Sequence, residues 1–164
     1  MSKKQVVVAV VGATGAVGEV LLRVLEERQL PVSQLKPLAS TRSAGTTVTF
    51  AGREARVEVA CPEAFDGVDL VFFAATGGLS KELAPEAVKR GAVVIDKSST
   101  WRMEADVPLV VPEVNAAAVD GHQGIIANPN CSTAGMLVAL KPRHAEDPIE
   151  RVVATPLQAT CSPA

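Results

Sequence analysis

The sequence predicts an α/β fold in which a mostly parallel, doubly wound sheet carries helices on both faces. The apolar run Val6–Val11 passes directly into a glycine-rich turn, and apolar residues then recur at helical spacing as far as Leu25. The same order of strand, glycine loop and helix returns between residues 68 and 90. Apolar runs without polar alternation suit strands covered on both faces, as parallel sheets require.

Three glycines follow the first strand with the spacing G-x-x-G-x-x-G. A phosphate can reach backbone N–H groups and a helix N-terminus only where no Cβ intervenes, so this turn is a candidate nucleotide site. An alternative is a glycine turn that only lets helix and strand pack closely. The candidate cofactor-binding residues here are Gly12, Thr14, Gly15, Ala16 and Val17.

The second strand is expected at residues 34–39, and the residues after it bear on cofactor choice. In dinucleotide-binding folds an acidic residue about 20 residues past the glycines holds the ribose 2′-hydroxyl, whereas an arginine accommodates a 2′-phosphate. Here the sequence is Ser40-Thr41-Arg42-Ser43, without Asp or Glu. It predicts NADP rather than NAD, with Ser40, Arg42 and Ser43 as ligands; the alternative is a solvated surface arginine in a turn.

A hairpin is expected at residues 46–50 and 53–59, and it carries no predicted chemistry. A further buried strand at residues 68–75 is followed by a glycine loop and a helix from about residue 80 to residue 90. Because this repeats the first strand, loop and helix, the fold is expected to be Rossmann-like, and Thr76 and Gly77 should lie at the same edge of the sheet as the first glycine turn.

A polar loop, residues 96–102, follows the strand expected at residues 92–95. Its lysine, serines and arginine stand just beyond a strand and could gather an anion. The candidate anion-binding residues are Lys97, Ser99 and Arg102. The alternative is a loop of solvated polar side chains.

Cys131 follows the strand expected at residues 124–127 and precedes an apolar helix at residues 134–140, which Lys141-Pro142 should close. At the first turn of a helix the unpaired N–H groups and the macrodipole favour a thiolate, so Cys131 is a candidate nucleophile. The alternative is an inert, buried thiol. His144 should lie about 20 Å away along the same helix, and His122 near the opposite end of the preceding strand, so neither can act as its acid–base partner.

Composition narrows the class of protein. With 164 residues, 48% of them hydrophobic and 21% charged, the chain suits one folded domain and not a disordered segment. A net charge of −2 and the absence of tyrosine give no basic, aromatic surface for nucleic acid. The charged N-terminus precedes a strand rather than a signal peptide, no run is long enough to span a membrane, and no metal site is predicted. Three cysteines without a C-x-x-C pair indicate a reducing cytoplasm.

Together these motifs resemble the N-terminal, nucleotide-binding half of aspartate-semialdehyde dehydrogenase, over roughly residues 6–155. The resemblance rests on the glycine turn, residues 40–45, residues 96–102, Val111-Pro112-Glu113-Val114-Asn115, and residues 128–133. It implies NADPH-dependent reduction of β-aspartyl phosphate to aspartate 4-semialdehyde with release of phosphate, on the route to lysine, methionine and threonine. It also implies a homo-oligomer that binds small molecules, with neither nucleic acid nor membrane as a partner.

The resemblance implies a role for several residues. Cys131 would be the nucleophile that carries a thioester, Asn130 a positioning group beside it, and Arg102 a ligand of the substrate phosphate. Gln158 would correspond to a family glutamine that contacts the reacting group. Residues 1–155 would form the NADP-binding domain, and residues 156–164 an atypical tail where the family's catalytic and dimerisation domain begins. That domain holds the acid–base histidine, a substrate-binding arginine and most of the dimer interface, so we expect this chain to have little or no turnover by itself.

Other classes of protein remain as alternatives. One is a short, non-catalytic paralogue that binds NADP as a sensor or partner subunit. N-acetylglutamyl-phosphate reductase shares the fold and the cysteine chemistry but ranks lower on the combined motifs. Sugar epimerases and short-chain reductases also use a G-x-x-G-x-x-G turn, yet they need a Tyr-x-x-x-Lys pair, and this chain has no tyrosine.

Overall fold

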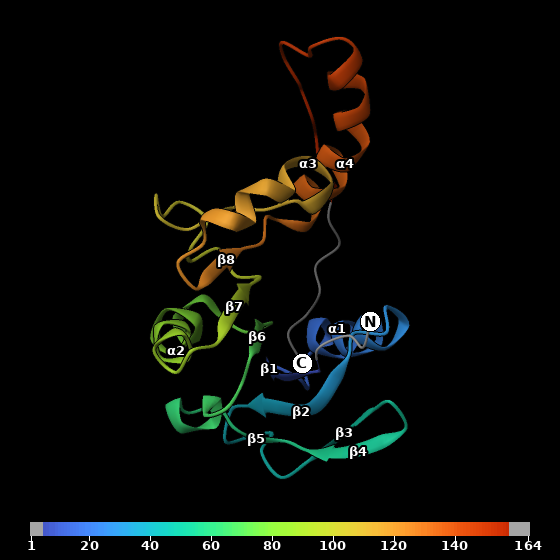
Figure 1. The fold of residues 1–164 in the computed structure, drawn as a ribbon. Coiled ribbons are helices and arrows are strands. Elements are labelled where there is room, and N and C mark those ends of the chain that lie inside the picture. The colour runs from blue at the N-terminus through green and yellow to red at the C-terminus, as the bar shows by residue number, and fades with distance from the viewer. Residues whose placement is uncertain (1–4, 158–164) are drawn as a thin grey trace.

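The structure, a computed structural model, describes residues 5–157. In this part of the chain six strands form one sheet in the order β5-β2-β1-β6-β7-β8, and every neighbouring pair is parallel (Figure 1). The predicted fold class, a Rossmann-like α/β sheet, is confirmed. The strands are β1 (Val6–Val11), β2 (Val32–Ala39), β5 (Glu58–Val59), β6 (Leu70–Phe73), β7 (Val93–Asp96) and β8 (Ile125–Ala127).

Strand order reverses beside β1. From β1 the chain crosses over to β2 and reaches β5 at one edge, and then returns to place β6, β7 and β8 on the other side of β1. The loops that leave β1 and β6 therefore diverge and open a crevice at their carboxyl ends. Such switch points are where open α/β sheets bind ligands.

Two long helices cover opposite faces of the sheet, α1 (Ala16–Glu27) and α2 (Gly77–Lys89) (Figure 1). Successive residues of β1 point to opposite faces, so Val8 and Val10 join the cluster of α1, whereas Ala9 and Val11 join that of α2. Residues 8–11 have no exposed surface, which confirms the strand predicted to be buried on both faces.

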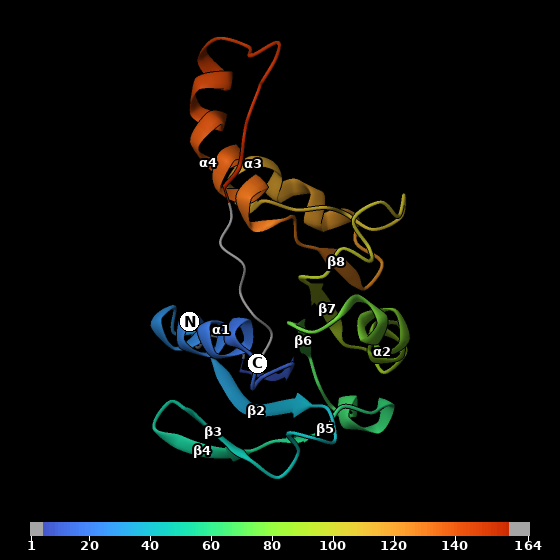
Figure 2. The same ribbon diagram turned by 180° about the vertical axis from the view of Figure 1, so that it is seen from behind.

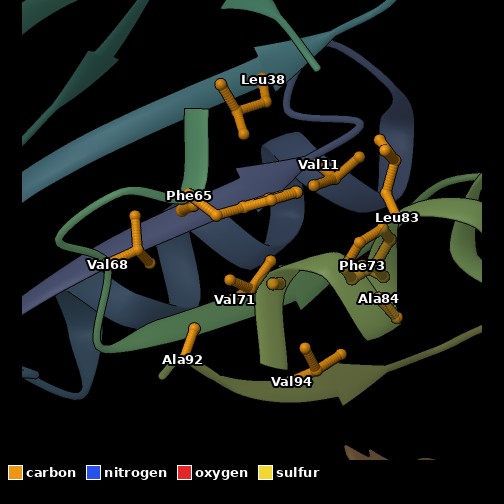
Figure 3. Packing of buried hydrophobic residues seen from close by; sticks show 12 residues of the cluster. Val11, Leu38, Phe65, Val68, Val71, Phe73, Leu83, Ala84, Ala92 and Val94 are labelled. Carbon is orange, nitrogen blue, oxygen red and sulfur yellow. The ribbon is translucent and has the colours of Figure 1, made fainter. Parts of the chain in front are cut away.

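The larger core cluster lies between the sheet and α2 (Figure 3). Leu83 and Ala84 of α2 pack there with strand residues such as Val11, Phe73 and Val94. Phe65, from the short 3₁₀ helix η1 (Pro62–Phe65), adds a second phenyl ring, with its centroid 6.2 Å from that of Phe73. This packing fixes α2 on the sheet, and with it the loops at the ends of β6 and β7.

The predicted hairpin is present as β3 (Thr47–Phe50) and β4 (Arg53–Arg56), which pair in antiparallel fashion. The expectation of one strand over residues 53–59 was wrong at its end. The chain leaves the hairpin at Val57, a fully buried residue whose N–H donates to the Thr46 carbonyl, and β5 then pairs in parallel with the end of β2. A buried apolar residue at the turning point draws the chain back to the main sheet.

The last part of the described chain contains α3 (Pro112–Asn115), the 3₁₀ helix η2 (Ala116–Gly121) and α4 (Cys131–Glu146). Helix α4 projects from the sheet in both views (Figures 1 and 2), and none of its residues is buried. It is longer than the predicted helix at residues 134–140, because Asn130 caps its start and the helix continues through Pro142. Within residues 5–157, no helix combines the length and apolar character needed to cross a membrane.

Candidate active site

A cleft of about 520 Å³ opens at the carboxyl edge of the sheet, beside the switch point between β1 and β6. Loops after β6, β7 and β8 line it together with the first turn of α1. Its lining residues are Val17, Ala74, Ala75, Lys97, Arg102, Asn128, Pro129, Asn130, Cys131 and Ala134. A hollow of about 570 Å³ lies elsewhere, between the start of β2 and the β3–β4 hairpin, but no cysteine or histidine is among its lining residues. The cleft with the cysteine is therefore the candidate site.

The glycine turn combines two kinds of constraint. Gly12 has a φ of +86°, and a Cβ there would lie 2.4 Å from the Ala74 carbonyl oxygen. A Cβ on Gly18 would lie 2.2 Å from the Gly12 oxygen. These two glycines therefore allow close packing, as the packing alternative requires. Gly15 differs, because it is exposed and a Cβ there would come no closer than 3.5 Å to the protein.

The start of α1 can hold a phosphate. Gly15 is the N-cap of this helix and supplies no side-chain cap, while Thr14 is half-buried and Ala16 and Val17 are exposed. The first turn of a helix leaves backbone N–H groups without intrahelical partners, and an anion satisfies them. The residues at this turn therefore fit the phosphates of a dinucleotide.

The residues predicted to choose NADP lie in a tight turn directly after β2, the strand next to β1. The N–H groups of Ser43 and Ala44 both donate to the Ser40 carbonyl, at 3.0 and 3.1 Å. Ser40 and Arg42 are exposed and Ser43 is half-buried. These side chains belong to the same edge of the sheet as the glycine turn but do not line the cleft.

Thr76 and Gly77 lie at the start of α2, also at this edge. Thr76 is the exposed N-cap residue of the helix. A Cβ on Gly77 would lie 2.7 Å from Oγ1 of Thr100, whose hydroxyl donates to the Gly77 carbonyl at 3.0 Å. Gly77 therefore has a packing reason to be glycine, and neither residue lines the cleft with the cysteine.

Of the predicted anion-binding residues, Lys97 and Arg102 line the cleft and Ser99 does not. The Arg102 side chain is held in place, because Nε donates to the Asn128 carbonyl and Nη2 to the Lys97 carbonyl, each at 3.0 Å. No carboxylate is among the described residues that line the cleft. Two cations therefore face this space without a lining acid to neutralise them.

Cys131 is exposed in the cleft as the first residue of α4, so its thiol is not buried as the alternative required. Asn130 lies beside it as the N-cap residue, and its side-chain oxygen accepts from the Ser132 N–H at 2.9 Å. Gln158, the third predicted catalytic residue, lies outside the described residues. The structure thus gathers Cys131, Asn130, Arg102, Lys97 and Val17 in one cleft.

Both histidines accept hydrogen bonds from backbone N–H groups outside the cleft. Nδ1 of His122 accepts from the Gly124 N–H, and Nδ1 of His144 accepts from the Ile149 N–H, each at 3.0 Å. His144 lines an apolar groove with Leu137 and Leu140 on α4. Neither is among the described residues that line the cleft, in agreement with the expectation that they cannot serve the thiol.

Asp96 and Ser80 are completely buried beneath the 97–102 loop, and no role was predicted for either residue. Their side chains are joined by a hydrogen bond of 2.6 Å from the Ser80 hydroxyl to the Asp96 carboxylate. A signal was present in the sequence, because Asp96 ends a buried strand and Ser98 follows two residues later, the spacing of an Asx turn.

The fold and the cleft define a class of protein, a nucleotide-binding α/β domain with an exposed cysteine at the binding edge of its sheet. The chain belongs to the family described as semialdehyde dehydrogenase, NAD binding domain, whose model matches residues 7–122. The family recognised from the motifs is thereby confirmed.

Individual relatives agree with this assignment. The chain is 54% identical over 152 residues to aspartate-semialdehyde dehydrogenase of Bacillus subtilis, covering 93% of this chain and 44% of that enzyme. It is 54% identical over 155 residues to the Aquifex aeolicus enzyme, covering 93% and 46%. The chain therefore spans slightly less than half the length of these curated relatives.

Solved structures show the same likeness. Aspartate semialdehyde dehydrogenase II from Vibrio cholerae superposes with a TM-score of 0.85 at 51% identity, over 90% of this chain and 44% of that one. The corresponding structure complexed with ASA gives a TM-score of 0.82 at 51% identity, over 87% and 47%. The Candida albicans enzyme, solved with NADP, gives 0.73 at 28% identity, over 89% and 48%.

Proposed function

We propose that this chain is the nucleotide-binding and thiol-bearing part of an NADP-dependent aspartate-semialdehyde dehydrogenase of amino-acid biosynthesis. The reaction is the reductive dephosphorylation of β-aspartyl phosphate to L-aspartate 4-semialdehyde. One observation carries the proposal: the exposed Cys131 shares its cleft with Lys97, Arg102 and the first turn of α1. A thiol, two cations and a phosphate-binding helix start are the groups that thiol-dependent reduction of an acyl phosphate needs.

The nucleotide would lie along the carboxyl edge of the sheet. Its phosphates would bind at Gly12, Thr14, Gly15, Ala16 and Val17, and a 2′-phosphate at the turn that holds Ser40, Arg42 and Ser43. Thr76 and Gly77 border the same edge. The relative from Candida albicans solved with NADP supports this choice of cofactor. When bound, NADPH supplies the hydride that reduces the acyl group to the aldehyde.

The chain's own residues would carry out acyl transfer. The Cys131 thiolate attacks the acyl carbon of β-aspartyl phosphate, a C–S bond forms, and the C–O bond to phosphate breaks with its electron pair leaving on inorganic phosphate. Arg102 and Lys97 face the cleft and stabilise the leaving phosphate. Asn130 caps α4 and so fixes the position of Cys131, whereas Ser99 does not line the cleft and is given no contact with the anion.

Acid–base help would have to come from groups beyond residues 5–157, because neither described histidine lines the cleft. A histidine of the kind the family uses is the proposed acid–base group, and Gln158 would contact the reacting group. We therefore expect this chain by itself to show little or no steady-state oxidation of NADPH with β-aspartyl phosphate. Full activity of the purified chain would refute this expectation. A purely non-catalytic NADP-binding subunit is less favoured, because the nucleophile is present and exposed.

Acyl transfer can be tested without turnover. Incubation with β-aspartyl phosphate should add an aspartyl group to the peptide that contains Cys131, detected by mass spectrometry. The half-buried Cys61 is the internal control and should remain unmodified, and Cys131→Ser should abolish the adduct. Equal labelling of Cys61 and Cys131, or no labelling of Cys131, would contradict the proposed role.

Nucleotide binding has its own test. NADPH should bind more tightly than NADH in a fluorescence titration. Gly15→Val should weaken NADPH binding, because the added side chain would occupy the space left for a phosphate while the described protein atoms leave room for its Cβ. Unchanged NADPH affinity in Gly15→Val would show that the nucleotide binds elsewhere.

Compartment and partners follow from the proposed chemistry. Acyl transfer needs Cys131 in its reduced form, which fits the reducing cytoplasm. The partners are then a small acyl phosphate, its aldehyde product, phosphate and NADP, together with further copies of the subunit as the family resemblance implies.

A further inference from the structure

Asp96 is a buried carboxylate on which three hydrogen bonds converge. It ends β7 and has no exposed surface. Its Oδ2 accepts from the hydroxyls of Ser80 and Ser98, at 2.6 and 2.8 Å, and its Oδ1 accepts from the Ser98 N–H at 2.6 Å. Burying an acid is costly unless such donors satisfy it, so this group has to be explained.

The hydrogen bonds continue from Asp96 into the loop above it. Trp101 donates through its indole Nε1 to the Ser80 hydroxyl at 2.9 Å, and the N–H of Thr100 donates to the Ser98 hydroxyl at 3.1 Å. The Thr100 hydroxyl in turn donates to the Gly77 carbonyl at the start of α2. Asp96 thus fastens the loop to a helix that the core already fixes on the sheet.

Arg102 is the next residue of this loop, and it connects the loop to the cysteine turn. Its Nε donates to the Asn128 carbonyl at 3.0 Å, while the Asn128 N–H donates to the Asp96 carbonyl at 2.8 Å. Both backbone groups of Asn128 are therefore held by the Asp96–Arg102 segment. Only Pro129 and Asn130 separate Asn128 from Cys131.

We propose that Asp96 is a positioning residue for the acyl-transfer site. Its carboxylate fixes the loop so that Arg102 is held on the Asn128 carbonyl, with the guanidinium in the cleft beside Cys131. The phosphate contact assigned to Arg102 rests on the proposed function. The positioning of Arg102 does not, because it depends only on hydrogen bonds within the fold.

The chemistry explains why an acid is needed. Three donors point at the Asp96 side chain: the Ser98 N–H, the Ser98 hydroxyl and the Ser80 hydroxyl. A carboxylate offers two acceptor oxygens for them. Asparagine has the same shape but only one acceptor oxygen. In one orientation its amide N–H₂ faces the Ser98 N–H; in the other it faces the two serine hydroxyls, which already accept from Trp101 and Thr100 and whose own hydrogens then lose their acceptor. A buried donor without an acceptor destabilises the arrangement around it.

The direct test is the side chain of Arg102 observed by NMR. In the full 164-residue chain the Nε–H of Arg102 should exchange slowly with water, because it is hydrogen-bonded to Asn128. In Asp96→Asn this exchange should become about tenfold faster, the factor that one net hydrogen bond supplies. The indole N–H of Trp101, the single tryptophan, should shift as well. Met103→Ala, which alters a residue 92% exposed beside Arg102, is the control and should change neither signal.

One further variant keeps the test decisive. If Asp96→Asn does not fold, Ser80→Ala removes one of the three donors and the link to Trp101, and it should accelerate the Arg102 exchange by a smaller factor. A general loss of stability would lower the melting temperature while leaving the Arg102 signal unchanged in the folded protein. That result, in either folded variant, overturns the proposal.

Inorganic phosphate then separates this proposal from the proposed function. Titration should show phosphate binding about tenfold weaker in Asp96→Asn and weaker still in Arg102→Ala, since charge-assisted hydrogen bonds from arginine are strong. If Arg102→Ala binds phosphate as well as the original chain, the phosphate role of Arg102 is wrong. The exchange rate of the Arg102 Nε–H in Asp96→Asn still decides whether Asp96 positions Arg102. If Asp96→Asn shows faster exchange of the Arg102 Nε–H but unchanged phosphate affinity, Asp96 positions Arg102, but this positioning does not contribute to phosphate binding.

Discussion

Replacing Gly18 by alanine tests whether the glycine turn is a packing junction as well as a nucleotide site. The new Cβ would lie 2.2 Å from the Gly12 oxygen and 2.8 Å from Cα of Ala13. Ordinary contacts begin near 3.4 Å, so α1 would have to move away from β1 by about an ångström. The atoms in the way are backbone and cannot rotate aside, which places the cost near the upper end of overpacking, about 3 kcal/mol.

Alanine also favours a helix over glycine by about 1 kcal/mol, which offsets part of this cost. The net loss of unfolding free energy for Gly18→Ala should therefore be about 2 kcal/mol. For a chain of this size each 1 kcal/mol lowers the melting temperature by about 2–4 °C, so we expect a decrease of about 4–8 °C.

Thermal unfolding followed by circular dichroism measures this change. The matched control is Gly135→Ala in α4, where a Cβ would meet no atom within 4 Å. That variant should unfold at the same temperature as the original chain or slightly higher. A Gly18→Ala protein as stable as the original, or a Gly135→Ala protein that loses as much, would refute the packing argument.

Three other changes probe the core, the surface charges and the cofactor turn. Phe73→Ala leaves a cavity at a fully buried position beside Phe65, so it should lower the free energy of unfolding, measured in urea, by about 3–5 kcal/mol. Met103→Ala should lower it by less than about 0.5 kcal/mol. The pKa of Glu86 lies below its usual 4.5 because Lys89 and Arg90 donate hydrogen bonds to its carboxylate. The stabilising contribution of Glu86 is therefore present above pH 4.5 and is lost as the pH falls through the lowered pKa. Glu86→Gln should lose less stability than the original chain when the pH is lowered through this range. Arg42→Ala should reduce the preference for NADPH over NADH in fluorescence titrations, and an unchanged ratio would assign the 2′-phosphate to other residues.

Much of the fold was predictable because its strands are local patterns. Val6–Val11 is an unbroken apolar run, and such a run next to a glycine turn predicts a buried parallel strand without knowledge of its neighbours. The separation of β5 from the hairpin was not predictable, because it depends on Val57 being buried by distant residues. The length of α4 was not predictable either, because Pro142 lies inside this helix, whereas proline after an apolar segment ordinarily indicates a helix end.

Part of the candidate site was also predictable from the sequence, and part was not. Cys131, Arg102 and Lys97 could be named in advance, because their residue types and their places after strands indicate the chemistry. The role of Asp96 could not be derived from the sequence alone. Its partner Ser80 comes from a different strand–helix unit, and only the packing of α2 against β7 brings the two side chains together.

By itself the sequence determined the order of the elements, the glycine turn, the position of the thiol at a helix start and the family. These properties depend on neighbouring residues, whose preferences act over one strand or one turn of helix. The tertiary structure alone decided that loops after β6, β7 and β8 meet α1 in one cleft, that Arg102 is hydrogen-bonded to the cysteine turn, and that the buried Asp96 carboxylate accepts from Ser80 of α2. Those relations join residues far apart in the chain, and only the packing of a complete sheet with its helices fixes their distances.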